Sequence, residues 1–355
     1  MIKPLIIKNP KLGERKIGPD YPPFIVAEAA VNHEGKIEIA KDLVRKAKEA
    51  GADCVKFQIH CLENEMLRNG VPRSDNMPEG KGLWEILEET NLSIEEHKEI
   101  KKFCEDLGIW YLCTPFSRDG ADILEKEIKV DFYKIGSGEI TNLPLIEHIA
   151  RKGKPMIIST GMTELKEVEE TVKLVKKIGT PFMLTHCTSA YPCPYEIVNL
   201  RLIPEYMEKF KVPVGLSDHS ATIYTAMGGV ALGACLIEKH FTYNKKAIGI
   251  DHASSIEPQE LAELVKGCHA IYKALGKPER KIQEREKPIV AWARESVVSE
   301  CDIPAGATIT SEMVWVKRPS PQAGEIPAKD LKKVIGKKAK TNIPKNTKLK
   351  WADLK

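Results

Sequence analysis

Eight short apolar runs alternate with helix-like stretches along the first 280 residues, and this alternation constrains the fold more than any other feature. Between the runs, apolar residues recur at helical spacing, as at Leu43, Val44 and Ala47, and Gly108 and Gly179 stand where helices should end. Eight strand and helix units in about 250 residues are typical of a (β/α)8 TIM barrel, an α/β fold. The runs are FIVAEAA (24–30), CVKFQ (54–58), WYLCTPF (110–116), DFYKIGS (131–137), PMIISTG (155–161), PFMLTHCTS (181–189), PVGLSDHS (213–220) and CLIEKHFT (235–242).

A charged, proline-flanked stretch, KPERKIQEREKP at 277–288, predicts a domain boundary after the barrel. We expect a barrel domain over 1–280, a linker over 281–291 and a second domain over 292–355. The second domain consists of short β-rich pieces broken by Pro and Gly. It contains two similar phrases, DIPAGATIT at 302–310 and NIPKNTKLK at 342–350. The repetition indicates a small, internally duplicated β domain.

The composition argues against several classes of function. The formal charge is +4, from 54 basic and 50 acidic residues spread along the chain, so nucleic-acid binding is not indicated. No apolar run approaches the roughly 18 residues of a membrane span, and the N-terminus lacks the apolar core of a signal peptide. The nine cysteines form no C-x-x-C pair, which favours reduced core thiols. We expect a soluble, cytoplasmic protein without a membrane partner.

In a TIM barrel, polar residues at the carboxyl ends of the strands surround the active site. Every predicted strand supplies such residues, several from more than one position. They are Glu28; Lys56 and Gln58; Thr114; Lys134, Ser137 and Glu139; Ser159; Ser189 and Tyr191; Ser217 and His219; and Glu238 and His240. The density of these groups predicts a catalytic barrel mouth.

His219 and His240 follow neighbouring predicted strands, so their imidazoles should lie close together. Either histidine alone could be a structural residue with a satisfied hydrogen bond. Two imidazoles without a nearby thiolate leave positions for water or substrate oxygens, which favours an open site with a hard ion such as Mn²⁺ or Mg²⁺.

Lys56 and Lys134 interrupt apolar strands, where a buried ammonium is costly unless an anion compensates it. One interpretation is a pair of salt bridges, to Glu28 and to Glu139. The other is an anionic substrate, and the hydroxyls and glycines of KIGSGE and STG suit a phosphate. Glu28 is either a lysine partner or the general base.

Several segments together carry a family resemblance. These are AEAAVNHEGKIEIAKDLVRKAKEAGADCVKFQ, TPFS, FYKIGSGE, ISTGM, HCTSAYP, GLSDHS, EKHFT and DHASSIEP. From about residue 20 to its end the chain resembles the sialic acid synthase (N-acetylneuraminate synthase) family, and its terminal domain resembles that family's antifreeze-protein-like (SAF) domain. The resemblance implies a condensation of phosphoenolpyruvate with an N-acetylated hexosamine and water.

The resemblance also implies roles for individual residues. It implies the metal ligands His219 and His240, for Mn²⁺ or Mg²⁺. The implied catalytic residues are Glu28, Lys56 and Glu139. The implied phosphoenolpyruvate contacts are Lys56, Thr114, Lys134, Ser137, Ser159, Ser189 and Ser217, and Ser189 stands where the family commonly has asparagine. The implied sugar contacts are Gln58, Tyr191, Asp251 and Arg318, and Arg318 would reach the neighbouring subunit of a domain-swapped homodimer.

Alternatives remain open at this point. The acceptor is N-acetylmannosamine or a 6-deoxy diacetamido hexose of the legionaminic or pseudaminic acid type. A metal-dependent pyruvate aldolase would use the same residue types. A non-enzymatic interpretation makes the small domain a carbohydrate binder on a barrel scaffold, which leaves the dense strand-end chemistry unexplained.

Overall fold

A computed structural model describes residues 2–68, 71, 72, 77 and 80–355 of the chain. It divides into two compact units, Met1–Gly276 and Lys277–Lys355. The stretch 281–291, expected as a linker, contains the start of a helix, α11 (Lys287–Ala293), that falls in the second unit. The exact extent of the linker stays a prediction.

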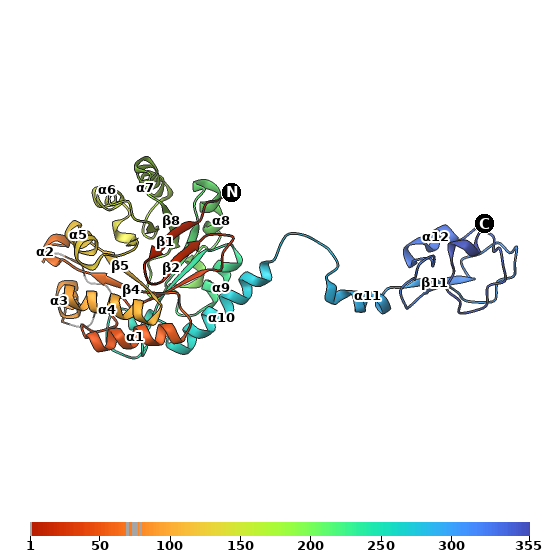
Figure 1. Cartoon of the computed structure of the whole chain (residues 1–355), viewed down its shortest axis with the longest axis horizontal. Helices are drawn as coiled ribbons and strands as arrows, with labels where there is room; N and C mark the ends of the chain where they lie inside the picture. Colours follow the sequence, from red (N-terminus) through yellow and green to blue (C-terminus); the bar gives the residue numbers. More distant parts are fainter. Residues whose placement is uncertain (1, 69–70, 73–76, 78–79) are drawn as a thin grey trace. The chain divides into compact units, whose positions relative to one another are not determined.

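The first unit is a barrel of eight parallel strands within the described residues, so the predicted TIM-barrel class is confirmed (Figure 1). Neighbouring strands follow the order β5-β4-β3-β10-β9-β8-β7-β6, and β5 contacts β6 to close the ring. Seven of the strands fall inside predicted runs, and β4 extends one residue beyond its run of 54–58. The strands are β3 (Phe24–Glu28), β4 (Cys54–Ile59), β5 (Trp110–Pro115), β6 (Tyr133–Ile135), β7 (Met156–Ser159), β8 (Phe182–Cys187), β9 (Val214–Asp218) and β10 (Leu236–His240).

Helices surround the strands because each carries one apolar face. In α1, residues Leu43, Val44 and Ala47 are buried against the barrel, as their spacing predicted. Gly108 and Gly179 adopt left-handed conformations directly after α4 and α7, which ends both helices. The helices of this unit are α1 (Ile37–Glu49), α2 (Leu62–Glu65), α3 (Leu83–Thr90), α4 (Ile94–Leu107), α5 (Arg118–Ile123), α6 (Leu143–Ala150), α7 (Leu165–Ile178), α8 (Leu202–Phe210), α9 (Tyr224–Ala231) and α10 (Pro258–Leu275).

A hairpin that the sequence analysis did not predict packs against one end of the barrel. It pairs β1 (Leu5–Asn9) with β2 (Gly13–Ile17) in antiparallel register. Leu5, Ile7 and Ile17 are buried in one cluster with Phe24, the first residue of β3. Since Phe24 lies at the amino end of its strand, the hairpin covers the end of the barrel opposite the strand-end polar residues.

The second unit has its own apolar core and short paired strands. They are β11 (Ser296–Ser299) and β12 (Val314–Lys317), and the unit also contains α12 (Leu331–Val334). The two similar phrases lie side by side: Ile303 and Ile343 exchange two backbone hydrogen bonds, of 2.8 and 2.9 Å. Asp302 and Asn342 each accept a backbone N–H from the opposite phrase, both at 2.7 Å. The predicted duplication is therefore a reciprocal pair.

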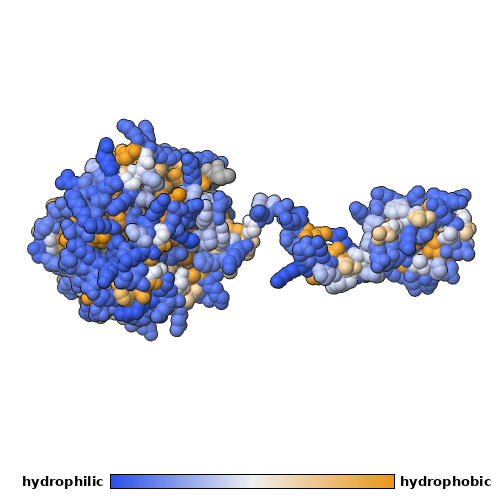
Figure 2. All heavy atoms as spheres, in the orientation of Figure 1, coloured by the Kyte–Doolittle hydropathy of each residue, from blue (hydrophilic) through white to orange (hydrophobic). Residues whose placement is uncertain are grey.

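Helix α11 has no buried residue within its own unit. Its Ile289 and Trp292 remain 54% and 56% exposed, and Figure 2 shows hydrophobic surface on this helix. Exposed apolar groups gathered on one short helix are typical of a contact surface.

Candidate active site

The carboxyl ends of the barrel strands enclose a cavity of about 490 Å³. Strand alternation explains its lining: Ser217 and Glu238, paired in the β9–β10 register, both point inward, whereas the next pair, Asp218 and Lys239, is not part of the lining. The cavity brings together every barrel residue that the sequence analysis assigned to the site. These are Glu28, Lys56, Gln58, Thr114, Lys134, Ser137, Glu139, Ser159, Ser189, Tyr191, Ser217, His219, His240 and Asp251.

Glu238 is the centre of the charged network in this cavity. Its carboxylate accepts from Lys134 Nζ at 2.7 and 2.9 Å and from Ser217 Oγ at 3.0 Å. Lys56 Nζ lies 3.2 Å from Glu238 and 3.0 Å from Glu28. The alternative that paired Lys56 with Glu28 therefore has a basis in the structure, but Lys134 pairs with Glu238 and not with Glu139.

Burial and charge divide the carboxylates of the cavity into two kinds. Glu238 is buried, which by itself raises a carboxyl pKa, but Lys134 and Lys56 hold its pKa well below the ordinary value. Burial raises the pKa of Glu28 to about 7 against the opposing effect of Lys56. Burial also raises the pKa of Glu139 to about 7, with a further contribution from Glu65. Glu28 and Glu139 can therefore gain or lose a proton near neutral pH.

Hydroxyls and a glycine form a small cradle beside the lysines. Ser159 Oγ lies 2.9 Å from the Thr185 hydroxyl, and the Gly161 N–H donates to Ser137 Oγ at 3.2 Å. A side chain at Gly161 would collide with the hydroxyls of Ser137 and Ser189. The glycine thus keeps open a space ringed by donors, which suits an anionic group.

His219 and His240 lie next to each other at the cavity wall, with ring centroids 5.3 Å apart. His219 Nδ1 donates to the Thr188 carbonyl at 2.9 Å, so in the neutral ring Nε2 carries the lone pair. Although burial opposes it, the contact with Cys187 raises the pKa of His219. His240 Nδ1 is buried without a hydrogen-bond partner among the described residues, 3.8 Å from Asp251 Oδ2. Burial lowers the pKa of His240, which favours the neutral, ligating form.

These two imidazoles fit a cation site that substrate or water completes. In the described part of the chain, no three side chains of His, Cys, Asp or Glu converge as a full set of ligands. Two adjacent imidazoles, one with an unpartnered nitrogen, can nevertheless act as the protein ligands of an open catalytic metal site.

A buried ion pair lies directly behind the two histidines. Lys239 Nζ is 2.9 Å from Asp218 Oδ2, and both side chains are almost completely buried. Because Asp218 precedes His219 and Lys239 precedes His240, the pair joins the two strand ends that carry the imidazoles.

Four ionisable residues of the cavity received no individual role from the sequence. They are Glu238, His60, Glu65 and Cys187. The sequence placed Glu238 at the barrel mouth without a role, and its shared strand face with His240 was the signal that it points into the cavity. Cys187 Sγ lies 3.9 Å from His219 Nδ1, so the expectation that no thiolate lies near the histidines was wrong. Although burial opposes it, the imidazole lowers the pKa of the Cys187 thiol to about 7.

Arg318, the remaining predicted site residue, belongs to the second unit. It is exposed, and its guanidinium carbon lies 5.4 Å from the centre of the Trp292 ring. The structure shows this cation–π contact within the unit, and the role of Arg318 toward a barrel stays a prediction.

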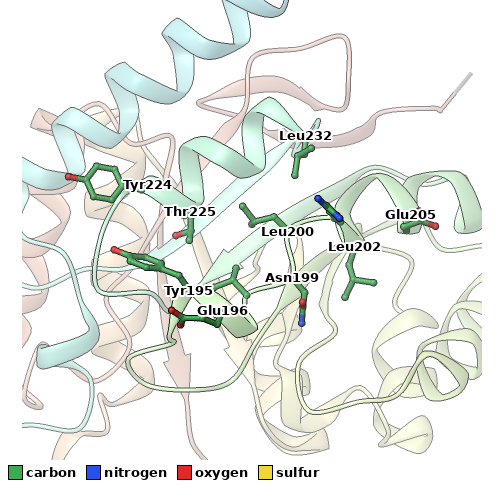
Figure 3. A pocket seen from close by; sticks show the side chains of 11 residues that line it. Tyr195, Glu196, Asn199, Leu200, Leu202, Glu205, Tyr224, Thr225 and Leu232 are labelled. Atoms are coloured by element: carbon green, nitrogen blue, oxygen red, sulfur yellow. The ribbon is translucent and has the colours of Figure 1, made fainter.

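A wider hollow of about 930 Å³ lies on the outside of the barrel, between the segment before α8 and helix α9 (Figure 3). Tyr195, Leu200, Tyr224 and Leu232 line much of it. It holds neither the lysines nor the imidazoles, so its residues offer no comparable chemistry, and we place the candidate site in the barrel mouth.

Known protein families match both units of the chain. Residues 43–280 match the NeuB family, and residues 294–355 match the SAF domain. The chain belongs to the NeuB family. The resemblance found from the sequence motifs is thereby confirmed, including the SAF domain.

Named relatives extend over nearly the whole chain. The N,N'-diacetyllegionaminic acid synthase of Legionella pneumophila is 38% identical over 92% of this chain and 93% of its own length. The N-acetylneuraminate-9-phosphate synthase of Homo sapiens is 36% identical over 93% of this chain and 92% of its own. The structure of N-acetylneuraminic acid synthetase from Leptospira borgpetersenii, in complex with citrate, superposes with a TM-score of 0.72 at 34% identity. It covers 81% of this chain and 96% of its own.

The helices were also compared with the requirements of a membrane span. In the part of the chain that the structure describes, none combines the length and the apolar character needed to cross a bilayer.

Proposed function

We propose that this NeuB-family protein is a sialic acid-type synthase. It condenses phosphoenolpyruvate with N-acetylmannosamine or a related N-acetylated hexosamine. C3 of phosphoenolpyruvate forms a bond to the aldehyde carbon of the open-chain sugar, water adds to C2, and phosphate leaves as the C2–O bond breaks. The products are a nine-carbon 2-keto-3-deoxy acid and inorganic phosphate. The observation that carries the proposal is the cluster of two buried lysines beside two adjacent imidazoles in one cavity.

The lysines and hydroxyls would bind phosphoenolpyruvate. Lys134, Ser137, Ser159, Ser189 and Ser217 all line the cavity and would bind the phosphate. Lys56 and Thr114, whose polar atoms lie 3.4 Å apart, would hold the carboxylate near the reacting carbons. In the absence of substrate, Glu238 compensates the two ammonium groups and holds them in the barrel. Burial lowers the pKa of Lys134, and Glu238 opposes this effect.

Glu28 and Glu139 are the proposed acid and base residues. Their pKa values of about 7 allow either carboxyl to hold or release a proton near neutral pH. Glu28 is positioned by Lys56 on one oxygen and by the Gln58 amide on the other, at 3.0 and 2.9 Å. It can therefore move a proton at the acceptor carbonyl or at the attacking water.

His219 and His240 would hold the divalent ion, Mn²⁺ or Mg²⁺. When bound, the ion supplies Lewis-acid polarisation of the acceptor aldehyde. Gln58, Tyr191 and Asp251 would contact the sugar. The Tyr191 ring lies 4.2 Å from that of His219, which places the tyrosine beside the proposed ligands.

Arg318 would complete the site from a second subunit of a domain-swapped homodimer. The exposed apolar face of α11 supports a contact between copies, because it lacks a covering partner within its own unit. We also propose that the enzyme acts in the cytoplasm, since the nine cysteines are free thiols suited to a reducing compartment.

Turnover with purified protein tests the proposal. Phosphoenolpyruvate, Mn²⁺ and a panel of N-acetylmannosamine and 6-deoxy diacetamido hexoses should release phosphate, with the nine-carbon acid detected by mass. Chelation should abolish turnover, and added Mn²⁺ or Mg²⁺ should restore it. Phosphate released from substrate labelled with ¹⁸O at the bridging position should retain the label, because the C2–O bond breaks.

The same panel separates the alternatives. A product from only one acceptor class would identify the sugar. Turnover with pyruvate in place of phosphoenolpyruvate would indicate an aldolase instead. Absence of phosphate release with every acceptor and both metals would contradict the proposed function.

A further inference from the structure

His60 lies in the wall of the cavity and has no role in the function proposed so far. Its Nδ1 is 2.9 and 3.1 Å from the two oxygens of Glu65, and its Nε2 is 3.3 Å from Gln58 Oε1. The imidazole stacks on the Phe116 ring, with centroids 4.6 Å apart and planes at 11°. Every polar atom of this ring therefore has a partner, and one partner is a proposed sugar contact.

The backbone of His60 is also held in place. Asn91 Nδ2 donates to the His60 carbonyl at 2.8 Å, and Asn91 Oδ1 accepts the His60 N–H at 3.4 Å. The residue lies just beyond the end of β4. Both its main chain and its ring are thus held firmly, although it follows a strand end where a loop begins.

The hydrogen bonds around Gln58 have a defined direction. The Gln58 amide nitrogen donates to Glu28 Oε1 at 2.9 Å, so the amide oxygen faces His60. A carbonyl oxygen only accepts, and therefore His60 Nε2 carries the hydrogen in this contact. The opposite ring nitrogen, Nδ1, faces the Glu65 carboxylate, another acceptor, so both ring nitrogens donate in this arrangement. The result is a directed chain from Glu65 through His60 and Gln58 to Glu28.

We propose that His60 is a positioning residue for the reaction, because its Nε2–H holds the Gln58 amide in the one orientation that donates to Glu28. The inference rests on the proposed function. Without that donor, the amide is free to turn and present its oxygen to the Glu28 carboxylate, where two acceptors repel. Glu28 would then lose one of the two contacts that orient it, and Gln58 would face the sugar with the wrong group.

Two amide substitutions at His60 distinguish the roles of its two ring nitrogens. In His60→Gln the side-chain nitrogen reaches the place of Nε2, and in His60→Asn it reaches the place of Nδ1. We expect kcat/KM for the acceptor to fall by about tenfold or more in His60→Asn but by less than about threefold in His60→Gln. The dissociation constant of phosphoenolpyruvate, measured without turnover, should change by less than about twofold in both. Glu63→Gln, an exposed carboxylate on the same short helix as Glu65, is the matched control and should behave as wild type.

Other outcomes overturn the inference. If His60 served only to hold Glu65 and the loop, His60→Asn would be the better enzyme, or both variants would lose thermal stability and phosphoenolpyruvate affinity together. If both retained wild-type kcat/KM, the positioning role would be wrong while the proposed function stood. If the wild-type protein did not condense phosphoenolpyruvate with any of the acceptors tested, the proposed function itself would be contradicted.

Discussion

Individual residues of the cavity show how burial selects chemistry. Glu238 and Glu139 are both carboxylates at the barrel mouth, yet Glu238 lies between two ammonium groups whereas Glu139 has a buried oxygen without a hydrogen-bond partner in the described residues. The first stays ionised as a counter-ion. The second has its pKa raised to about 7 by burial and by Glu65. The surroundings of the two carboxylates thus make Glu238 a permanent charge and Glu139 a group that can exchange a proton.

Glu139→Gln should make the protein more stable than wild type, and more so at alkaline pH. An ordinary carboxyl ionises at 4.5 and Glu139 in the fold at about 7, so the folded state binds the extra proton between these values. Wild-type stability therefore falls as pH rises through this window, and the loss remains above it. The free energy of unfolding of the variant should exceed that of wild type by about 1–2 kcal/mol more at about pH 8 than at about pH 5.

Urea denaturation at the two pH values measures this difference. Glu49→Gln removes an exposed carboxylate in α1 and should show no comparable pH dependence. A difference between wild type and Glu139→Gln that is the same at both pH values would show that Glu139 ionises normally.

Paired strand ends set the geometry of the proposed metal ligands. β9 and β10 run side by side with Asp218 opposite Lys239, and each member of this ion pair precedes one of the histidines. Ser220 and Thr225 add hydrogen bonds to the Asp218 carboxylate, at 3.1 and 2.6 Å. A shift of one residue between the strands would leave both charges buried without partners. The ion pair therefore selects the register that brings the imidazoles together.

Breaking this ion pair should destabilise the barrel strongly. We expect Asp218→Asn and Lys239→Met each to lower the free energy of unfolding by about 3 kcal/mol, because each leaves a buried charge unpaired. The double variant should lose much less free energy of unfolding than the two single variants lose together. A double-mutant cycle by urea denaturation gives the coupling, and the half-exposed pair Lys209–Glu169, at 2.7 Å, is the control, with an expected coupling below about 1 kcal/mol. Equal coupling in both cycles would contradict a special role for the buried pair.

At the scale of the whole molecule, the chain consists of a barrel with a nearly complete site and a small unit that carries Arg318. The small unit also presents α11 with Ile289 and Trp292 exposed, and the Arg318 guanidinium packs over the same Trp292 ring. An arginine held by an aromatic ring next to an exposed apolar helix face suits contact with another copy of the chain. This arrangement supports, at the level of the assembly, the proposal that each site is completed in trans.

Mixing two inactive variants tests completion in trans. His240→Ala disables the barrel site and Arg318→Ala disables the contribution of the small unit. If Arg318 acts on the neighbouring subunit, random hybrids of the two variants contain one intact site, so the mixture should recover about a quarter of wild-type turnover. If Arg318 acts within its own chain, both sites of every hybrid are defective. No recovery after subunit exchange, verified by mass, would therefore contradict the swapped arrangement.

The sequence by itself determined the barrel, because continuous apolar runs bounded by glycine-capped helices have few other ways to bury their side chains. It also determined the strand-end residues that line the cavity, since strand order and chain direction bring those ends to one rim. The hairpin β1–β2 escaped prediction because a short polar-faced ribbon has a weak local signal and is stabilised by contacts with Phe24 and its neighbours across the barrel end.

Only the tertiary structure decided how the charges pair. Glu139 lies close to Lys134 in the sequence, yet the Lys134 ammonium pairs with Glu238. Glu238 belongs to β10, which is not a neighbour of the Lys134 strand β6 in the barrel. The chain from Glu65 through His60 and Gln58 to Glu28 likewise depends on ring and amide orientations that no spacing encodes. Spacing along a strand determines which face a residue occupies, whereas the partner it meets there depends on distances between strands, which exist only once the barrel has closed.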